Sequence, residues 1–590
     1  MQNSLNITIV LGDMDYPLTE ARYDITSKLK NVLDQLKYNY EPKLEIPNED
    51  LGDFSFPCFN LAVIIKKSPE DIAEEIASRI KKSRWIKKVK TTRGYVNFFI
   101  DKQLLVSSTL KSIDHKKEDY GKLKKKNKKV IIEHTSANPN GPLHVGRARN
   151  PIIGDTLVRI FKVAGFNVES QFYLDDMGKQ VAILTWGIGN LNLKDIPVST
   201  YNKSDHKNVG FYQIANKLMK DDEKISKEIS NIIKNSERGD IKTIELIHKA
   251  YSPVLKGINE SLKHINITID KYIHESDFVK NKSVDIVVEK LKKSKYCGNE
   301  NGGFYLDIES FGIHGRNTKF FFTRSDGTTL YATRDIAYHL WKGKHADILI
   351  NVLGEDHKLE SKQVEIALNL LNVKTVPKPI FYAFVSMHGG KMSTRHGRVV
   401  YLDDLIEECV NRAYKEVKIR RGLELSEGKM REISEIIGIG SLRYNIIKVQ
   451  PEKDIVFKWE DALNFEGNSA PFIQYAHARA CGILSKMGKN KDDKDANYLL
   501  LEHDSEYNLV KKIAKFPMVI EDAAKGFKPH IIASYLFDTA SQFNQFYRDC
   551  HVLSEKNPYL KKARIALVNS TRIVLKNGLD ILGIIAPEEM

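Results

Sequence analysis

The sequence predicts an α/β fold with an open parallel sheet at its centre, and three observations carry this prediction. Apolar runs alternate with amphipathic helical stretches in the middle of the chain, which is the pattern of βαβ units. A mixed module precedes this region, and helical periodicity alone follows it. The length of 590 residues exceeds what one hydrophobic core can serve, so several domains are expected.

Residues 1–115 are predicted to form an N-terminal α+β domain. Ser68 stands where a helix N-cap belongs, with Pro69 at the first helical position and acidic residues in the first turn. The expected elements are helices at 23–36 and 68–82 and a strand at 94–100. The basic charge run at 116–129 is interpreted as a solvated linker.

Residues 130–402 are predicted to form a Rossmann-type domain, because strand-like and helix-like runs alternate through it. The expected strands are 129–135, 168–176, 346–354 and 378–387, with a helix at 152–164. Pro151 should kink this helix or mark a restart, because it removes a backbone donor. The polar stretch at about 187–294 has helical patterning without such strands, and we expect an insertion there.

Residues 403–590 are predicted to form an all-α helix bundle. The segment 530–550 carries an apolar stripe at helical spacing, which we interpret as core packing rather than a cofactor site. The stripe consists of Ile532, Leu536, Thr539, Phe543 and Phe546.

Composition limits the function. The net charge of +15, from 91 Lys and Arg against 76 Asp and Glu, favours a polyanionic partner, although a lysine-rich composition can also reflect coding bias. No apolar run reaches the ~18 residues that span a bilayer, and no export signal is convincing, so we expect the cytoplasm and no membrane. The five cysteines are scattered, which predicts reduced thiols and no dedicated metal site.

The stretch EHTSANPNGPLHVGRARN, residues 133–150, joins a buried strand to a helix through a loop of small residues. In open α/β sheets such a strand end and helix start bind phosphate, because free N–H groups and the helix dipole face the anion. Gly146 permits close approach, while His144 and Arg147 supply donors for a developing charge. The alternative is a surface histidine beside glycines that only make turns.

A second motif favours the nucleotide interpretation. The glycine-flanked stretch GGKMSTRHG, residues 389–397, follows the last predicted strand and carries Lys391, Arg395 and His396. A mobile cationic loop of this kind suits the triphosphate of ATP as pyrophosphate leaves.

Together the two motifs resemble the His-x-Gly-His and Lys-Met-Ser-Lys-Ser signatures of class I aminoacyl-tRNA synthetases, and the full strings resemble the arginyl-tRNA synthetases. Arg147 stands where the class has its second histidine, and Thr394 where most members have their second lysine. The resemblance extends through most of the chain, in the strings GYVNFFI, DDMGKQ, YATRD, FIQYAHAR and STRIVLKNGLDILGIIAPEEM.

The resemblance implies that L-arginine and ATP, with Mg²⁺ accompanying ATP, form arginyl-adenylate, and that arginine then passes to the terminal ribose of tRNA(Arg). It also implies that tRNA is needed for the first step. The three domains would be a tRNA-contacting domain, a catalytic domain and an anticodon-binding domain. The implied catalytic residues are His144, Arg147, Lys391 and Arg395. The implied ATP contacts are His144, Gly146, Arg147, Gly354, His357, Lys391, Met392 and Ser393.

The resemblance also implies how arginine is held. Tyr331 and Asp335 lie one helical turn apart and would meet the guanidinium. The full set of implied arginine contacts is Glu133, Ser136, Asn138, Glu275, Tyr331, Asp335 and Glu355. For Asp335 the alternative is a surface salt bridge, for example with Arg334, and His357 could equally be structural.

Tyr475, Arg479, Phe546 and Tyr547 are candidates for contacting an unstacked anticodon, because single-stranded RNA stacks on aromatic and arginine planes. Each could instead belong to the bundle core, and for Phe546 the core is favoured. A monomer is expected, with a homodimer as the alternative. Two rivals stay open, a small nucleotidylyltransferase and a catalytically inactive synthetase paralogue that binds RNA.

Overall fold

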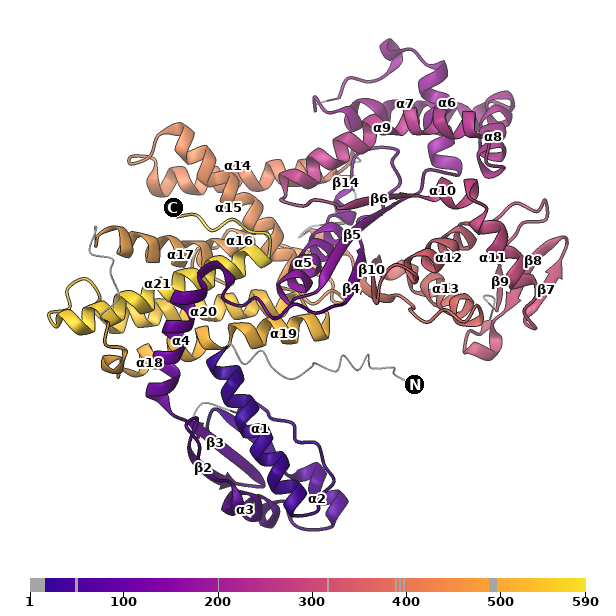
Figure 1. The fold of residues 1–590 in the computed structure, drawn as a ribbon. Helices are drawn as coiled ribbons and strands as arrows, with labels where there is room; N and C mark the ends of the chain where they lie inside the picture. Colours follow the sequence, from indigo (N-terminus) through magenta and orange to yellow (C-terminus); the bar gives the residue numbers. More distant parts are fainter. Residues whose placement is uncertain are drawn as a thin grey trace.

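The structure is a computed structural model that describes residues 16–47, 51–199, 201–315, 318–387, 390–391, 394–395, 398–487 and 496–590 (Figure 1). A small N-terminal module, a central sheet region with peripheral helices, and a C-terminal bundle follow one another along the chain. Within the described residues, no helix is both long and apolar enough to cross a membrane. The five cysteines are free thiols, as expected.

The N-terminal module is an antiparallel sheet, in the order β1-β3-β2, with helices packed beside it. Ser68 caps α3 as predicted, since its Oγ accepts the N–H of Asp71 at 3.1 Å. The elements are α1 (Pro17–Gln35), β1 (Phe54–Pro57), α2 (Phe59–Ile65), α3 (Pro69–Arg79), β2 (Ile86–Thr92), β3 (Tyr95–Ile100) and α4 (Lys102–Lys116).

The central sheet has five parallel strands in the order β11-β10-β4-β5-β6. From β4 the chain crosses through α5 to β5 on one side, and it later returns to β10 on the other side, so the strand order reverses between β4 and β10. Ligands bind outside the carboxyl ends of the strands at such a switch point. The elements are β4 (Lys129–Glu133), α5 (Arg149–Val163), β5 (Asn167–Leu174), β6 (Lys271–His274), α12 (Tyr331–Lys342), β10 (Ile348–Gly354), α13 (Lys358–Leu370) and β11 (Lys378–Tyr382).

The expectation that residues 187–294 hold no strand of the sheet is wrong at β6, which pairs with β5 at the sheet edge. This strand has only four residues, with one buried side chain, so no apolar alternation marks it. A separate antiparallel sheet, β7-β8-β9, follows. The elements are α6 (Lys179–Asn190), α7 (Ser204–Asp221), α8 (Glu223–Glu237), α9 (Ile241–His264), α10 (Glu275–Lys280), α11 (Ser283–Lys292), β7 (Cys297–Glu300), β8 (Gly303–Asp307) and β9 (Lys319–Phe321).

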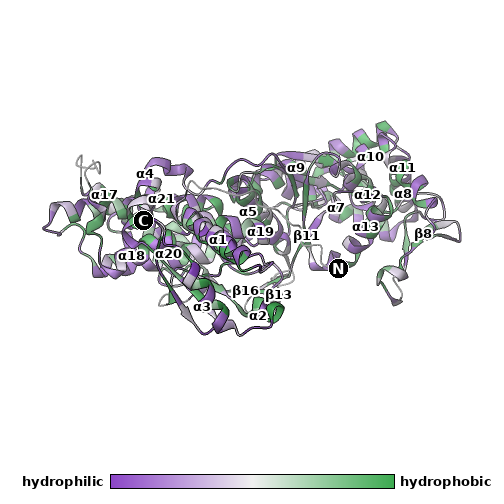
Figure 2. Ribbon diagram, turned by 60° about the horizontal axis from the view of Figure 1, so that its bottom comes forward, coloured by the Kyte–Doolittle hydropathy of each residue, from purple (hydrophilic) through white to green (hydrophobic). Residues whose placement is uncertain are grey.

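The C-terminal part is helical, and the predicted stripe on α20 is fully buried. In Figure 2 its helices alternate between green hydrophobic and purple hydrophilic positions. Among the described residues after 403, strand β16 also occurs and pairs with β12, contrary to expectation. The elements are β12 (Val385–Met387), β13 (Gly390–Lys391), β14 (Thr394–Arg395), β15 (Arg398–Val399), α14 (Leu402–Arg421), α15 (Glu427–Ile447), β16 (Ile455–Phe457), α16 (Trp459–Ala462), α17 (Ala470–Ser485), α18 (Asp504–Ala514), α19 (Phe516–Gly526), α20 (His530–Asp549) and α21 (Pro558–Ile581).

The segment at 116–129 is not solvated throughout, contrary to the sequence interpretation. Tyr120 is 1% exposed, and its ring packs against those of Tyr16 and Phe516. The side-chain amide of Asn577 on α21 donates to the carbonyl oxygens of Lys117 and Tyr120, at 3.1 and 3.0 Å. The buried ring of Tyr120 and these two hydrogen bonds therefore hold the lysine-rich segment against the bundle.

Candidate active site

A cavity of about 1160 Å³ opens at the carboxyl ends of the sheet strands. Glu133 ends β4, Gly354 ends β10, Tyr382 ends β11, Tyr173 is the penultimate residue of β5, and Glu275 follows β6. This is the switch-point crevice that the topology predicts. The cavity lining includes these sequence-predicted residues: Glu133, Ser136, Asn138, His144, Gly146, Arg147, Glu275, Tyr331, Asp335, Gly354 and His357.

Of the predicted arginine contacts, Glu355 is not part of the cavity lining, and its carboxylate instead lies 3.5 Å from the ammonium of Lys358.

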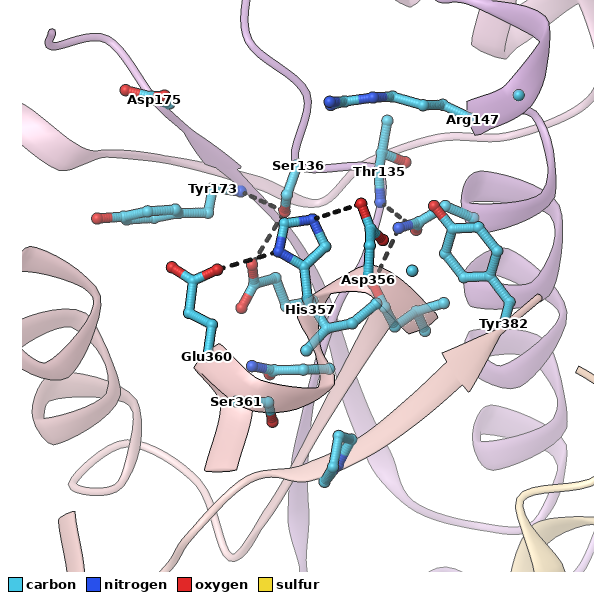
Figure 3. Close-up of a pocket in the computed structure, with 18 of the residues that line it drawn as sticks. Thr135, Ser136, Arg147, Tyr173, Asp175, Asp356, His357, Glu360, Ser361 and Tyr382 are labelled. Atoms are coloured by element: carbon cyan, nitrogen blue, oxygen red, sulfur yellow. Dashed lines mark hydrogen bonds and ion pairs between the residues drawn. The ribbon is translucent and has the colours of Figure 1, made fainter. Parts of the chain in front are cut away.

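The loop after β4 carries backbone strain. Thr135 and Ser136 have φ angles of +71° and +30°, in the left-handed region that a β-branched residue rarely adopts. Asn150 on α5 holds this conformation, since its Oδ1 accepts the N–H of Thr135 at 2.6 Å and its amide donates to the carbonyl of Val352 at 2.9 Å. Ser136 Oγ donates to Glu133 at 3.0 Å and accepts the N–H of Tyr173 at 3.2 Å (Figure 3).

The His-Val-Gly-Arg motif forms a helical entry. His144 caps the short 3-10 helix η3 (Val145–Arg147), because its Nδ1 accepts the N–H of Gly146 at 3.0 Å. Arg147 is exposed and lines the cavity. The α-helix restarts at Arg149, so Pro151 lies in the first turn, where its missing N–H has no intrahelical partner. Of the two expectations for Pro151, the restart is confirmed.

Helix α12 presents polar side chains on successive turns, and a buried network runs from it to β4. The ammonium of Lys342 lies 2.6 Å from Glu133 and 3.0 Å from Asn351 Oδ1. Asn351 in turn lies 2.7 Å from His339 Nε2, and His339 Nδ1 is 3.0 Å from Asp335. Burial raises the pKa of Asp335, but His339 and Lys342 outweigh it and hold the pKa below its ordinary value.

Sequence reasoning missed Lys342, His339 and Asn351. Lys342 is fully buried, and only its position on the same helix face, about two turns after Asp335 and about one turn after His339, could have marked it.

The opposite end of the cavity is acidic. The Glu275 carboxylate lies 2.6 Å from Arg334, whose guanidinium carbon is 4.9 Å from the Tyr331 ring centroid. Asp175 Oδ1 and Glu275 Oε2 are buried without a hydrogen-bond donor among the described residues. Burial, and then the neighbouring Glu275, raise the pKa of Asp175 well above its ordinary value. Arg334 pairs with Glu275 rather than with Asp335, and the ion-pair partner of Asp335 on its own helix is His339.

Figure 3 shows Asp175 and Arg147 well apart in the cavity, with His357 between Asp356 and Glu360. His357 Nδ1 lies 3.0 Å from Glu360, and this contact raises the pKa of His357 above its ordinary value. The side chain of His357 lines the cavity and also contacts Glu360.

The second motif lies partly outside the described residues. The backbones of Lys391 and Arg395 belong to β13 and β14, while Met392 and Ser393 lie outside the described range. Where the loop leaves toward α14, it is tied to the first motif. The N–H of Val145 donates to Val400 at 3.0 Å, and the N–H of Leu402 donates to Leu143 at 2.8 Å. The chain that directly follows the second motif therefore lies beside the first motif.

On the bundle, Tyr475 and Tyr547 are 41% and 39% exposed, and the guanidinium carbon of Arg479 lies 4.8 and 5.3 Å from their ring centroids. Phe546 is 0% exposed and packs in the core. It cannot stack on a base, so the core interpretation is correct for Phe546.

The middle of the chain matches a family of known enzymes. The family model described as tRNA synthetases class I (R), catalytic domain, matches residues 109–459. The fold and the site thus define a class I aminoacyl-tRNA synthetase. The models described as Arginyl tRNA synthetase N terminal domain and DALR anticodon binding domain match residues 20–100 and 473–590. The chain belongs to the arginyl-tRNA synthetase family.

Curated relatives agree over nearly the whole chain. The arginine–tRNA ligase of Methanocella arvoryzae is 46% identical, covering 95% of this chain and 98% of its own. That of Methanothermobacter thermautotrophicus is 42% identical, covering 97% and 99%. The solved structure of Thermus thermophilus arginyl-tRNA synthetase has a TM-score of 0.83 at 26% identity, covering 96% and 100%.

Proposed function

We propose that the protein is an arginine–tRNA ligase, which activates L-arginine with ATP to arginyl-adenylate and transfers arginine to the 3′-terminal ribose of tRNA(Arg), releasing pyrophosphate and AMP. The observation that carries this proposal is the cavity itself. One side opens at the helical entry of His144, Gly146 and Arg147, and the other holds buried carboxylates. A phosphate is bound by N–H donors and cations, whereas a guanidinium is bound by carboxylates, so the two sides suit the two substrates.

At the acidic end, Asp335 and Tyr331 meet the guanidinium, with Glu275 and Asp175 as further acceptors. A carboxylate matches the planar guanidinium with two parallel hydrogen bonds, which the ammonium of lysine cannot make. Lysine would leave a buried acceptor unpaired, so discrimination on the order of 10⁴-fold is attainable without editing. Glu133, Ser136 and Asn138 receive the α-amino and carboxyl groups at the end of β4.

At the other end, His144, Gly146, Arg147, Gly354 and His357 surround ATP, together with the loop of Lys391, Met392, Ser393 and Arg395. Catalysis then consists of placing the arginine carboxylate in line with the α-phosphate and stabilising the charge that develops there. Mg²⁺ enters with ATP as part of the substrate.

Tyr475, Arg479 and Tyr547 form an exposed aromatic and cationic cluster that suits unstacked bases of tRNA. We expect the enzyme to work in the cytoplasm, where its tRNA, arginine and ATP are found.

The test is charging of a tRNA pool from a related organism with each amino acid in turn. Arginine alone should be attached, at the 3′ end, with ATP consumed. Tight tRNA binding without attachment of any amino acid would favour the inactive RNA-binding paralogue instead.

A further inference from the structure

Behind the acidic end of the cavity, a buried carboxylate meets two imidazoles. Asp176, which follows β5, is fully buried, and its Oδ2 lies 2.6 Å from His248 Nε2 and 3.3 Å from His274 Nδ1. His248 lies on α9 and His274 ends β6, so three separate elements converge. Among the described residues, the ion pairs of Asp176 are with these two histidines only.

The donor set suits a first-row transition metal. Imidazole nitrogen and carboxylate oxygen bind Zn²⁺ at ~2.0–2.1 Å, so neighbouring ligand atoms of a tetrahedral ion lie about 3.3 Å apart. The Asp176 oxygen lies 2.6 and 3.3 Å from the two imidazole nitrogens, and all three ligand atoms lie within 4.8 Å of one another. Side-chain rotations can therefore bring them to this spacing. Mg²⁺ prefers oxygen ligands, so two nitrogens also discriminate against the ion that accompanies ATP.

The surroundings support ligation. The N–H and Oγ of Ser276 donate to the two Asp176 oxygens at 2.9 and 2.7 Å, which orients the carboxylate as an outer-shell partner does. The side chains of His248 and His274 are 30% and 31% exposed, so water and ions can reach them. The Tyr251 hydroxyl, 2.8 Å from His274 Nδ1, would yield this contact to the metal.

A second cluster of the same residue types has no room for a metal ion. Asp205, His206 and Asp403 also converge, but all three are buried. The ammonium of Lys203 lies 2.9 and 2.8 Å from the two Asp403 oxygens and supplies the cation itself. Full burial and a resident lysine therefore close this cluster to metal. In the Asp176 cluster both histidines are partly exposed, and no lysine pairs with Asp176 among the described residues.

We propose that Asp176, His248 and His274 form a binding site for Zn²⁺ or a related first-row transition metal, with water in the fourth position. The ion would fasten α9 to β5 and β6. Because Asp175 and Glu275 are the chain neighbours of Asp176 and His274, it would also stiffen the acidic end of the cavity. The site differs from the catalytic centre and does not depend on the proposed activity.

The experiment uses the full-length protein, stripped with a chelator, incubated with Zn²⁺ or Co²⁺ at neutral pH and desalted. We expect one zinc ion per chain by elemental analysis, a visible Co²⁺ spectrum of tetrahedral type, and a Zn²⁺-dependent rise in Tm. His248→Ala and His274→Ala should abolish all three. His264→Ala should retain them, because His264 is a half-exposed histidine on the same helix that pairs with Glu435.

Circular dichroism of each variant establishes that it is folded, and His248→Gln provides a second, polar replacement. The proposal is overturned if the folded wild-type protein retains no zinc after desalting. It is equally overturned if the His248 and His274 variants retain as much zinc as the wild type, since the ion would then be bound elsewhere.

Discussion

Within the cavity, the carboxylates differ in whether a cation already neutralises them. Glu133 pairs with the ammonium of Lys342, Glu275 pairs with the guanidinium of Arg334, and Asp335 pairs with His339. Asp175 and Glu275 each keep a buried oxygen without a donor among the described residues. Acceptor oxygens without a donor therefore lie at Asp175 and Glu275, close to Asp335, where an entering guanidinium finds hydrogen-bond acceptors.

The first prediction concerns Asp335. Asp335→Asn should raise the KM for arginine by about 10²-fold or more, because a desolvated guanidinium loses its charged partner. Steady-state aminoacylation kinetics measure the effect. Glu355→Gln is the matched control, and it should change the KM by less than about twofold, because Glu355 lies outside the cavity lining beside exposed Lys358. Equal effects of both substitutions would contradict our placement of arginine.

The second prediction concerns the cationic loop. Lys391→Ala should slow adenylate formation by about 10²- to 10³-fold, the usual cost of losing one preorganised transition-state donor. Arginine binding should barely change, because the loop serves the phosphate end. Single-turnover kinetics and equilibrium arginine binding separate the two quantities. A near-normal rate of adenylate formation would mean that Lys391 has no catalytic role.

The third prediction concerns His134, which is fully buried beside the strained loop. Burial lowers its pKa from 6.5 to about 4, so the folded protein keeps it neutral. An unfolded histidine takes up a proton near pH 6.5, so this residue should withdraw about 2 kcal/mol of stability as pH falls from 7.5 to 5. Urea unfolding should therefore show that the free energy of unfolding falls more steeply with decreasing pH in the wild type than in His134→Asn. Equal pH dependence in the two proteins would contradict a neutral, buried His134.

Among the elements, those with strong local signals could be predicted from the sequence. The cap of α3, the long apolar strands and the stripe of α20 all appear where expected, because each follows from spacing alone. Edge strand β6 could not be predicted, since its pairing with β5 supplies its stability. The same holds for the residues of the cavity. Those in the two motifs could be predicted, whereas Asp175, His339 and Lys342 come to line or support the cavity only when elements distant in the sequence pack together.

The fourth prediction concerns the packing of α5 on β4. A Cβ at Gly154 would collide with the Cβ and Cγ of His134, so Gly154→Ala should destabilise the protein by about 1–3 kcal/mol and disturb the phosphate-facing helix start. Gly482→Ala on α17 is the control, because nothing lies within 4 Å of the added carbon. It should be neutral or stabilise by up to about 1 kcal/mol. Denaturant unfolding gives both values, and equal effects would contradict the close approach.

At the scale of the whole molecule, the N-terminal module and the bundle are joined to each other. Arg22 pairs with Glu521 at 2.7 Å, and Lys511 pairs with Asp53 at 2.8 Å. Together with buried Tyr120, these contacts hold two predicted RNA-contacting parts in one arrangement around the sheet. The exit of the Lys391 loop is tied to the His144 motif, so tRNA that bridges these parts could close the loop over its substrates.

The most direct test of whether tRNA completes the active site is arginine-dependent exchange between ATP and pyrophosphate, measured with and without tRNA. We predict negligible exchange in RNA-free enzyme, restored by tRNA(Arg) and by arginine alone among the amino acids. The restored rate should fall as salt rises, because phosphate contacts with the basic chain release counterions. Robust exchange without RNA would contradict the completion of the site by tRNA, and exchange driven by another amino acid would contradict the arginine assignment itself.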